Sequence, residues 1–258
     1  MLGCLSTALF FLEPNPLQGN KLDFLIILFS TVWVIYTADH VIDGYRFKGK
    51  SGILRYDFNF LYIKIILPIC AGITVFAISL ILKNKNTTFV TNGLWIAPII
   101  PIYFFLKFKG KLKPLVKMAI ISVVVSSVMV SLYNSPTIFY DFLTLERLII
   151  ALMVFLNLLV LEHFEYHEEH KQMQPETVDL YLNIAKRVFI WIVIMLILAT
   201  YQNIASWPFT VSLFLAALFI RIILNYQTLF GRNRRYRYWA DFSFLLMWPL
   251  LKLFQLFA

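Results

Sequence analysis

Two acidic segments stand out in a chain that is otherwise strongly apolar, and carboxylates in such a pattern could bind divalent cations. Asp39 and Asp43 are four residues apart and would share one face of a helix. Glu162, Glu165 and Glu169 follow the spacing i, i+3 and i+7, which also places them on one helical face. Because Mg²⁺ is typically held by carboxylates together with substrate phosphates, the two segments predict a site at which divalent cations bind between two acidic faces.

Each acidic segment comes at the end of an apolar run, and the whole composition is that of a membrane protein. Of the 258 residues, 60% are hydrophobic and only 14% are charged, whereas soluble domains contain about 25% charged residues. The sequence therefore predicts an all-α integral membrane protein, embedded in a lipid bilayer as a single domain over residues 1–258.

About nine apolar segments could cross a bilayer, for which a helix needs about 20 mostly apolar residues. The first, residues 1–12, is short, and we interpret it as a truncated or tilted helix. The others are expected at residues 22–38, 58–82, 89–106, 115–133, 147–161, 188–205, 208–225 and 239–257. The connection over residues 162–187 is then the longest loop. This layout predicts a polytopic helical bundle.

The basic residues test this layout independently, because Lys and Arg are enriched in cytoplasmic loops. Most of the 23 Lys and Arg fall on one side of the layout, and those on the other side are Lys21, Lys83, Lys85, Arg147 and Lys252. We therefore expect a multi-pass protein of the cell (inner) membrane, with the N-terminus and both acidic segments in the cytoplasm and the C-terminus outside. The same asymmetry accounts for the net charge of +9 without nucleic acid as a partner.

Histidines in the second acidic segment offer a different metal chemistry. His163, His167 and His170 recur at i, i+4 and i+7 and could ligate iron or zinc. A metalloprotease helix requires His-Glu-x-x-His, and the run from His167 to His170 is one residue shorter than that motif. A histidine-dependent membrane metalloprotein is therefore one alternative interpretation.

The first acidic segment and a motif downstream resemble the UbiA superfamily of intramembrane prenyltransferases, whose members have nine transmembrane helices and two cytoplasmic acidic motifs. Asp39 and Asp43 match the last two acids of the family's first motif, Asn-Asp-x-x-Asp-x-x-x-Asp, which follows the second helix. Tyr103 and Lys107 are similar to the family's Tyr-x-x-x-Lys at the end of the fourth helix. The chain departs from the family at the start of the first motif, where Ile35-Tyr36 replaces Asn-Asp.

The second acidic segment resembles the other motif of that superfamily. Glu162, Glu165 and Glu169 reproduce the spacing of Asp-x-x-Asp-x-x-x-Asp, which follows the sixth helix, with Glu at each acidic position. The Arg-Pro-x-x-x-Gly that usually follows the first motif is absent, and Arg46 is the nearest candidate phosphate partner there.

The resemblance implies a UbiA-like bundle that binds Mg²⁺ and transfers an isoprenyl group from an isoprenyl diphosphate to a hydrophobic acceptor, either aromatic or lipid. It implies catalytic roles for Asp39, Asp43, Glu165 and Glu169, metal ligands at Asp39, Asp43, Glu162, Glu165 and Glu169, and diphosphate contacts from Arg46, Tyr103, Lys107 and Lys109. The incomplete first motif leaves a second interpretation open. In that interpretation the chain is a catalytically degenerate UbiA-like subunit with a binding or assembly role in the membrane.

Overall fold

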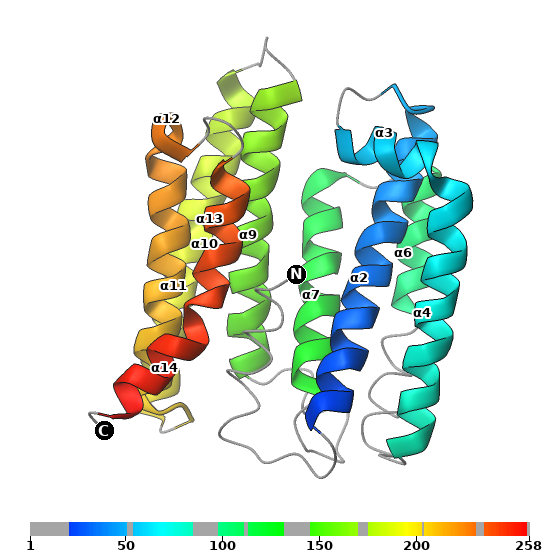
Figure 1. Cartoon of the computed structure of the whole chain (residues 1–258). Coiled ribbons are helices and arrows are strands. Elements are labelled where there is room, and N and C mark those ends of the chain that lie inside the picture. Colours follow the sequence, from blue (N-terminus) through cyan, green and yellow to red (C-terminus); the bar gives the residue numbers. More distant parts are fainter. Residues whose placement is uncertain are drawn as a thin grey trace.

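Every regular element in the described part of the chain is a helix (Figure 1). The computed structural model describes residues 21–50, 54–84, 98–110, 113–131, 145–169, 175–202, 204–230 and 235–256. In chain order the helices are α2 (Lys21–Arg46), α3 (Leu54–Leu61), α4 (Ile63–Asn84), α6 (Ile99–Phe108), α7 (Pro114–Ser131), α9 (Leu145–Glu169), α10 (Pro175–Tyr201), α11 (Trp207–Asn225), α12 (Gln227–Phe230), α13 (Arg235–Leu245) and α14 (Met247–Gln255). The expected all-α class is confirmed for these residues.

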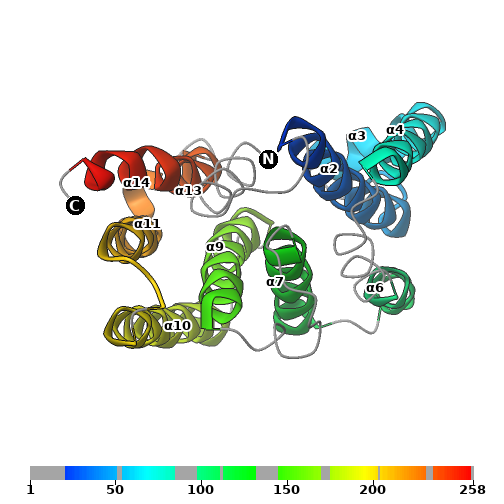
Figure 2. The ribbon, with the colours of Figure 1, turned by 90° about the horizontal axis from the view of Figure 1, so that it is seen from below.

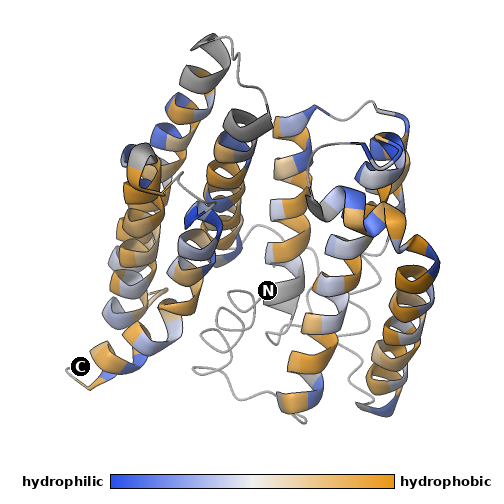
Figure 3. Cartoon of the chain, turned by 45° about the horizontal axis from the view of Figure 1, so that its top comes forward, coloured by the Kyte–Doolittle hydropathy of each residue, from blue (hydrophilic) through white to orange (hydrophobic). Residues whose placement is uncertain are grey.

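Several of these helices can cross a membrane, as the composition predicts. Within the described residues, five are long and apolar enough: Leu25–Arg46, Ile63–Lys83, Arg147–Phe164, Leu180–Tyr201 and Trp207–Asn225. Shorter apolar helices occur at Ile99–Phe108 and Pro114–Ser127. The chain is therefore a multi-pass membrane protein, and Figure 3 shows apolar residues along most of the length of the long helices. The expected first span, residues 1–12, lies outside the described residues.

The helices form two groups that meet along α7. In the first group α2 packs against α3, α4 and α6. In the second, α9 packs against α7, α10, α11 and α13, and α14 packs against α11. Helix α7 also contacts α2 and α6, less extensively than it contacts α9. Seen along the helices, α7 lies between α9 and the first group (Figure 2).

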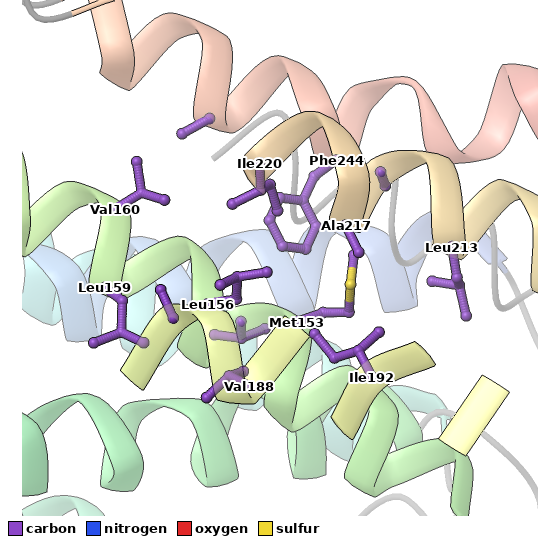
Figure 4. Close-up of a cluster of buried hydrophobic side chains, with 14 of the residues drawn as sticks. Met153, Leu156, Leu159, Val160, Val188, Ile192, Leu213, Ala217, Ile220 and Phe244 are labelled. Carbon is purple, nitrogen blue, oxygen red and sulfur yellow. The ribbon is translucent and has the colours of Figure 1, made fainter. Parts of the chain in front are cut away.

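An apolar core holds the second group together (Figure 4). Met153 and Leu156 of α9 meet Ile192 of α10 and Ala217 of α11 in this core, and all four side chains are almost fully buried. Lipid tails are as apolar as these side chains, so close packing rather than the hydrophobic effect drives helix association inside a membrane. Small residues such as Ala217 allow that close packing.

The expected loop over residues 162–187 is mostly helical instead. Helix α9 continues to Glu169, and α10 begins at Pro175. The prediction placed a loop there because the segment is polar, but polar residues such as Glu form helices readily and neither Gly nor Pro interrupts residues 162–174. Pro175 occupies the first position of α10, where a missing N–H costs nothing. Consequently Glu162, Glu165 and Glu169 all lie on one continuous helix, as their spacing predicts.

The expected ninth span falls on two consecutive helices, α13 and α14, which meet at Leu246. Pro249 explains this break, because it has no N–H to donate to the carbonyl of Leu245 and its ring crowds that carbonyl. Hydrogen bonds from Leu246 N–H to Phe242 and from Leu250 N–H to Leu246 continue across the junction, each 3.0 Å long. The chain therefore bends between α13 and α14 without unwinding, as Figure 1 shows.

Two glycines allow α3 to cross close to the end of α2. A Cβ added to Gly44 would lie 2.3 Å from the carbonyl oxygen of Tyr56. Gly49 ends the turn after α2 with φ +67, and a Cβ there would lie 2.6 Å from the Phe60 ring. Any side chain at Gly44 would push α3 away from α2, because a backbone carbonyl cannot rotate aside. Gly44 thus has a packing role.

We expect Gly44→Ala to lower the free energy of unfolding by about 1–3 kcal/mol, the usual cost of forcing an extra methyl group into a packed contact. The measurement is thermal unfolding of the purified protein in detergent. Gly72→Ala on α4 is the matched control, because a Cβ there meets nothing within 4 Å. Equal melting temperatures for the two variants would contradict the close approach of α3 to Gly44.

Candidate functional site

The site is built on one face of α2, near the end that carries α3. Asp39 and Asp43 are one helical turn apart, and their side chains are only 10% and 9% exposed. Helix α2 runs through both residues without a break. The predicted shared helical face is therefore confirmed, and both carboxylates point away from solvent.

Helix α6 supplies the main partners of these carboxylates. The Lys107 ammonium forms ion pairs with both, contacting Asp39 Oδ1 directly and lying 2.8 Å from Asp43 Oδ2. It also donates a 2.8 Å hydrogen bond to the main-chain oxygen of Asp39. The Tyr103 hydroxyl donates to Asp39 Oδ1, so Tyr103 and Lys107, one turn apart on α6, reach the same carboxylate. Lys107 is only 3% exposed.

Helix α7 adds a second ammonium group to this cluster. Lys117 Nζ lies 3.4 Å from Asp39 Oδ2 and 3.8 Å from Asp43 Oδ2. The charge of Lys117 also interacts with the carboxylate of Glu162 on α9. Helix α7 packs against both α2 and α9, the helices that carry the two acidic segments. We call Asp39, Asp43, Tyr103, Lys107 and Lys117 the carboxylate cluster.

His40 packs beside the carboxylate cluster among aromatic rings. Its Nδ1 lies 3.7 Å from Asp39 Oδ2. The imidazole centroid is 4.0 Å from that of Tyr36 and 5.3 Å from that of Tyr56, which meets it edge-on. Tyr56 belongs to α3, so the close approach of α3 to Gly44 also brings the Tyr56 ring against His40.

Other predicted site residues lie apart from the cluster. The Lys109 ammonium lies over the Phe105 ring, 4.2 Å from its centroid, on an exposed part of α6. Arg46 is exposed at the end of α2, and its guanidinium would lie 3.3 Å from a Cβ added to Gly110. The structure thus brings Arg46 to the end of α6, one turn beyond Asp43.

The second acidic segment is described only in part. Glu162 is half-buried on α9 and interacts with Lys117, whereas the side chains of Glu165 and Glu169 lie outside the described part of the structure. His163 is fully buried in α9 and meets the Phe164 ring edge-on. The side chain of His167 and the whole of His170 are also outside that part, so the three-histidine alternative stays a prediction.

The sequence contained a signal for Lys117 that the resemblance did not use. Lys117 is the third residue of the expected span 115–133, and a charged residue inside an apolar run usually pairs within the bundle or marks function. Its charge was instead assigned to the cytoplasmic excess of Lys and Arg. His40, next to Asp39, carried a similar signal.

The carboxylate cluster fits a divalent cation shared with a ligand. Among the described residues no group of three or more His, Cys, Asp or Glu side chains could enclose a metal ion. Asp39 and Asp43 can nevertheless both reach one small cation, because the single ammonium of Lys117 already lies within 3.8 Å of an oxygen of each. Mg²⁺ commonly uses one or two carboxylates and takes its remaining ligands from water and phosphates. Two carboxylates therefore suffice for a site completed by a phosphorylated ligand.

Comparison with known proteins adds no relative. No protein-family model, curated protein or solved structure matches the chain. The resemblance to the UbiA superfamily consequently depends on the residues quoted above and on their placement.

Lys107 and Lys109 provide a matched test of the cluster, since both lie near the end of α6. We expect Lys107→Met to lower the free energy of unfolding by about 3–5 kcal/mol, because it removes the principal partner of two buried carboxylates. Lys109→Met should change it by no more than about 0.5 kcal/mol, as is usual for an exposed side chain. Thermal unfolding in detergent measures both. A similar loss in the two variants would show that the buried ion pairs do not hold α6 against α2.

Proposed function

We propose that this protein is an intramembrane prenyltransferase with a UbiA-like bundle of about nine transmembrane helices. It would bind an isoprenyl diphosphate with Mg²⁺ at the carboxylate cluster and pass the isoprenyl group to an aromatic or lipid acceptor. Arg46 and the basic end of α6 would face the diphosphate from the cytoplasmic side. The second acidic segment would complete the metal site through Glu165 and Glu169.

One observation carries this proposal: Tyr103 and Lys107 meet Asp39 and Asp43 although the two pairs are far apart in the sequence. Their contacts join residues separated by 64 and 68 positions. The resemblance matches these same two pairs to motifs on the second and fourth helices. Chance would rarely place two short motifs from different spans in hydrogen-bonding contact, and this supports a common role for them.

The chemistry that the cluster would support is ionisation of an allylic diphosphate. The carbon–oxygen bond breaks, and the diphosphate leaves with the electron pair. A bound Mg²⁺ would offset the charge that develops on this leaving group. Lys107 would add a fixed positive charge, and Tyr103 would hold Asp39 in position through its hydroxyl. The acceptor then bonds to the isoprenyl carbon and loses a proton to solvent.

A second candidate function follows from the charge balance of the cluster. Lys107 and Lys117 each form ion pairs with both carboxylates, so the charges of Asp39 and Asp43 are already matched within the protein. Such a network would serve equally to fasten helices together. This favours, as the alternative, a UbiA-like subunit that has lost catalysis and acts in membrane binding or assembly.

We expect isoprenyl diphosphates to raise the melting temperature of the purified protein only when Mg²⁺ is present. A ligand at 100 times its dissociation constant stabilises the folded state by about 2.7 kcal/mol. The experiment titrates geranyl, farnesyl and geranylgeranyl diphosphates in detergent, with Mg²⁺ or with a chelator. Asp39→Asn and Asp43→Asn should each abolish the shift, because an uncharged amide oxygen holds a divalent cation much more weakly than a carboxylate does.

Asp241→Asn is the control for these variants, because Asp241 is exposed on α13, in the second helix group. This variant should keep the full Mg²⁺-dependent shift. Wild-type binding by Asp39→Asn would remove that residue from the metal site. The absence of a shift with every chain length, in a protein that melts cooperatively, would favour the non-catalytic subunit.

A further inference from the structure

Lys117 is held in the carboxylate cluster differently from Lys107. Its Nζ lies 3.4 and 3.8 Å from the nearest oxygens of Asp39 and Asp43, farther than the roughly 2.7–2.9 Å of a charge-assisted hydrogen bond. Lys107 instead donates at 2.8 Å to Asp43 Oδ2 and at 2.8 Å to the main-chain oxygen of Asp39. Charge alone therefore holds Lys117, whereas Lys107 is fixed by directed hydrogen bonds.

Lys117 is also the more accessible of the two lysines. Its side chain is 24% exposed, against 3% for Lys107. It comes from the first turn of α7, a helix that packs against both α2 and α9. A lysine ammonium sits on a flexible four-carbon chain. Because its side chain is partly exposed, Lys117 is the lysine of the two that can exchange its partners.

We propose that Lys117 is an exchangeable cation of the substrate site. Without ligand it balances Asp39 and Asp43; when a divalent ion shares those carboxylates with a diphosphate, Lys117 leaves them and contacts the diphosphate oxygens. Lys107 stays in place and keeps α6 on α2. This inference rests on the proposed function, because it concerns diphosphate bound at the same two carboxylates.

The exchange predicts opposite effects on two kinds of ligand. An ammonium beside two carboxylates repels an incoming divalent ion, so the divalent ion alone must compete with Lys117. A diphosphate gains a cation from the same side chain. Removing the charge of Lys117 should therefore strengthen binding of the metal ion alone and weaken binding of the diphosphate.

We expect Lys117→Met to bind Mn²⁺ alone about tenfold more tightly than wild type, and farnesyl diphosphate with Mg²⁺ about tenfold more weakly, each equivalent to about 1.4 kcal/mol. Electron paramagnetic resonance of free Mn²⁺ measures the first and thermal-shift titration the second, both on the full chain in detergent. Lys113→Met is the matched control, because Lys113 is exposed just before α7 and should change neither affinity. Lys117→Arg keeps the charge and should resemble wild type in both assays.

The possible results separate this inference from the function on which it rests. If wild type binds farnesyl diphosphate with Mg²⁺ but Lys117→Met matches wild type in both assays, the exchange is wrong and the proposed function stands. Weaker diphosphate binding without tighter Mn²⁺ binding also overturns the exchange, since Lys117 would then not compete with the metal. If wild type binds neither ligand, the proposed function and the inference fail together. Lys117→Gln repeats the test should the Met variant not fold.

Discussion

The contact between Lys107 and the two carboxylates of α2 is the constraint on which the position of α6 depends. A buried carboxylate costs several kcal/mol unless an opposite charge and hydrogen bonds replace its water. Asp39 and Asp43 are both buried, so their helix can pack only where another helix brings a cation to them. Helix α6 does so with Lys107, and Tyr103 satisfies a further lone pair of Asp39. The polar cluster therefore fixes the position of α6 against α2.

The two helix groups are consequently held by different interactions. The second group has a large apolar core built from α9, α10, α11 and α13. The carboxylate cluster lies where the first group meets α7, and Lys117 reaches across that boundary to Asp39 and Asp43. Ion pairs can exchange partners, whereas close-packed side chains resist rearrangement.

Much of the fold could be predicted from the sequence, because apolar length alone identifies a membrane helix. The expected spans 22–38, 147–161 and 208–225 fall within helices long enough to cross. Most of the spans 58–82 and 188–205 does too, but residues 58–61 belong to the short helix α3, and α10 ends at Tyr201. The structure of the polar segments is harder to predict from the sequence. Residues 162–169 continue α9, since helix propensity does not depend on hydrophobicity. The ninth span bends because Pro249 cannot donate a hydrogen bond to the carbonyl of Leu245. Nothing in the hydrophobic pattern distinguishes a polar helix from a polar loop.

In the site, too, residue spacing predicts which side chains share a face of one helix, but not which side chains of different helices meet. Four-residue spacing placed Asp39 with Asp43 on one face of α2 and Tyr103 with Lys107 on one face of α6, and only the motif resemblance connected the two pairs. Spacing within one helix cannot show which lysine of a neighbouring helix will turn inward. Lys107 is buried in the cluster, whereas Lys109, two residues away, lies over an exposed ring.

The charge balance of the cluster finally limits how any ligand can enter it. Asp39 and Asp43 are neutralised by Lys107 and Lys117, so a divalent cation cannot join them at low cost unless a lysine gives way. Displacing Lys107 would remove the ion pairs between α6 and α2 and leave its buried ammonium without an opposite charge. Displacing Lys117 costs no directed hydrogen bond, and its side chain is already partly exposed. If a phosphorylated ligand binds here with a metal ion, the side chain that must move is on α7, at the boundary between the two helix groups.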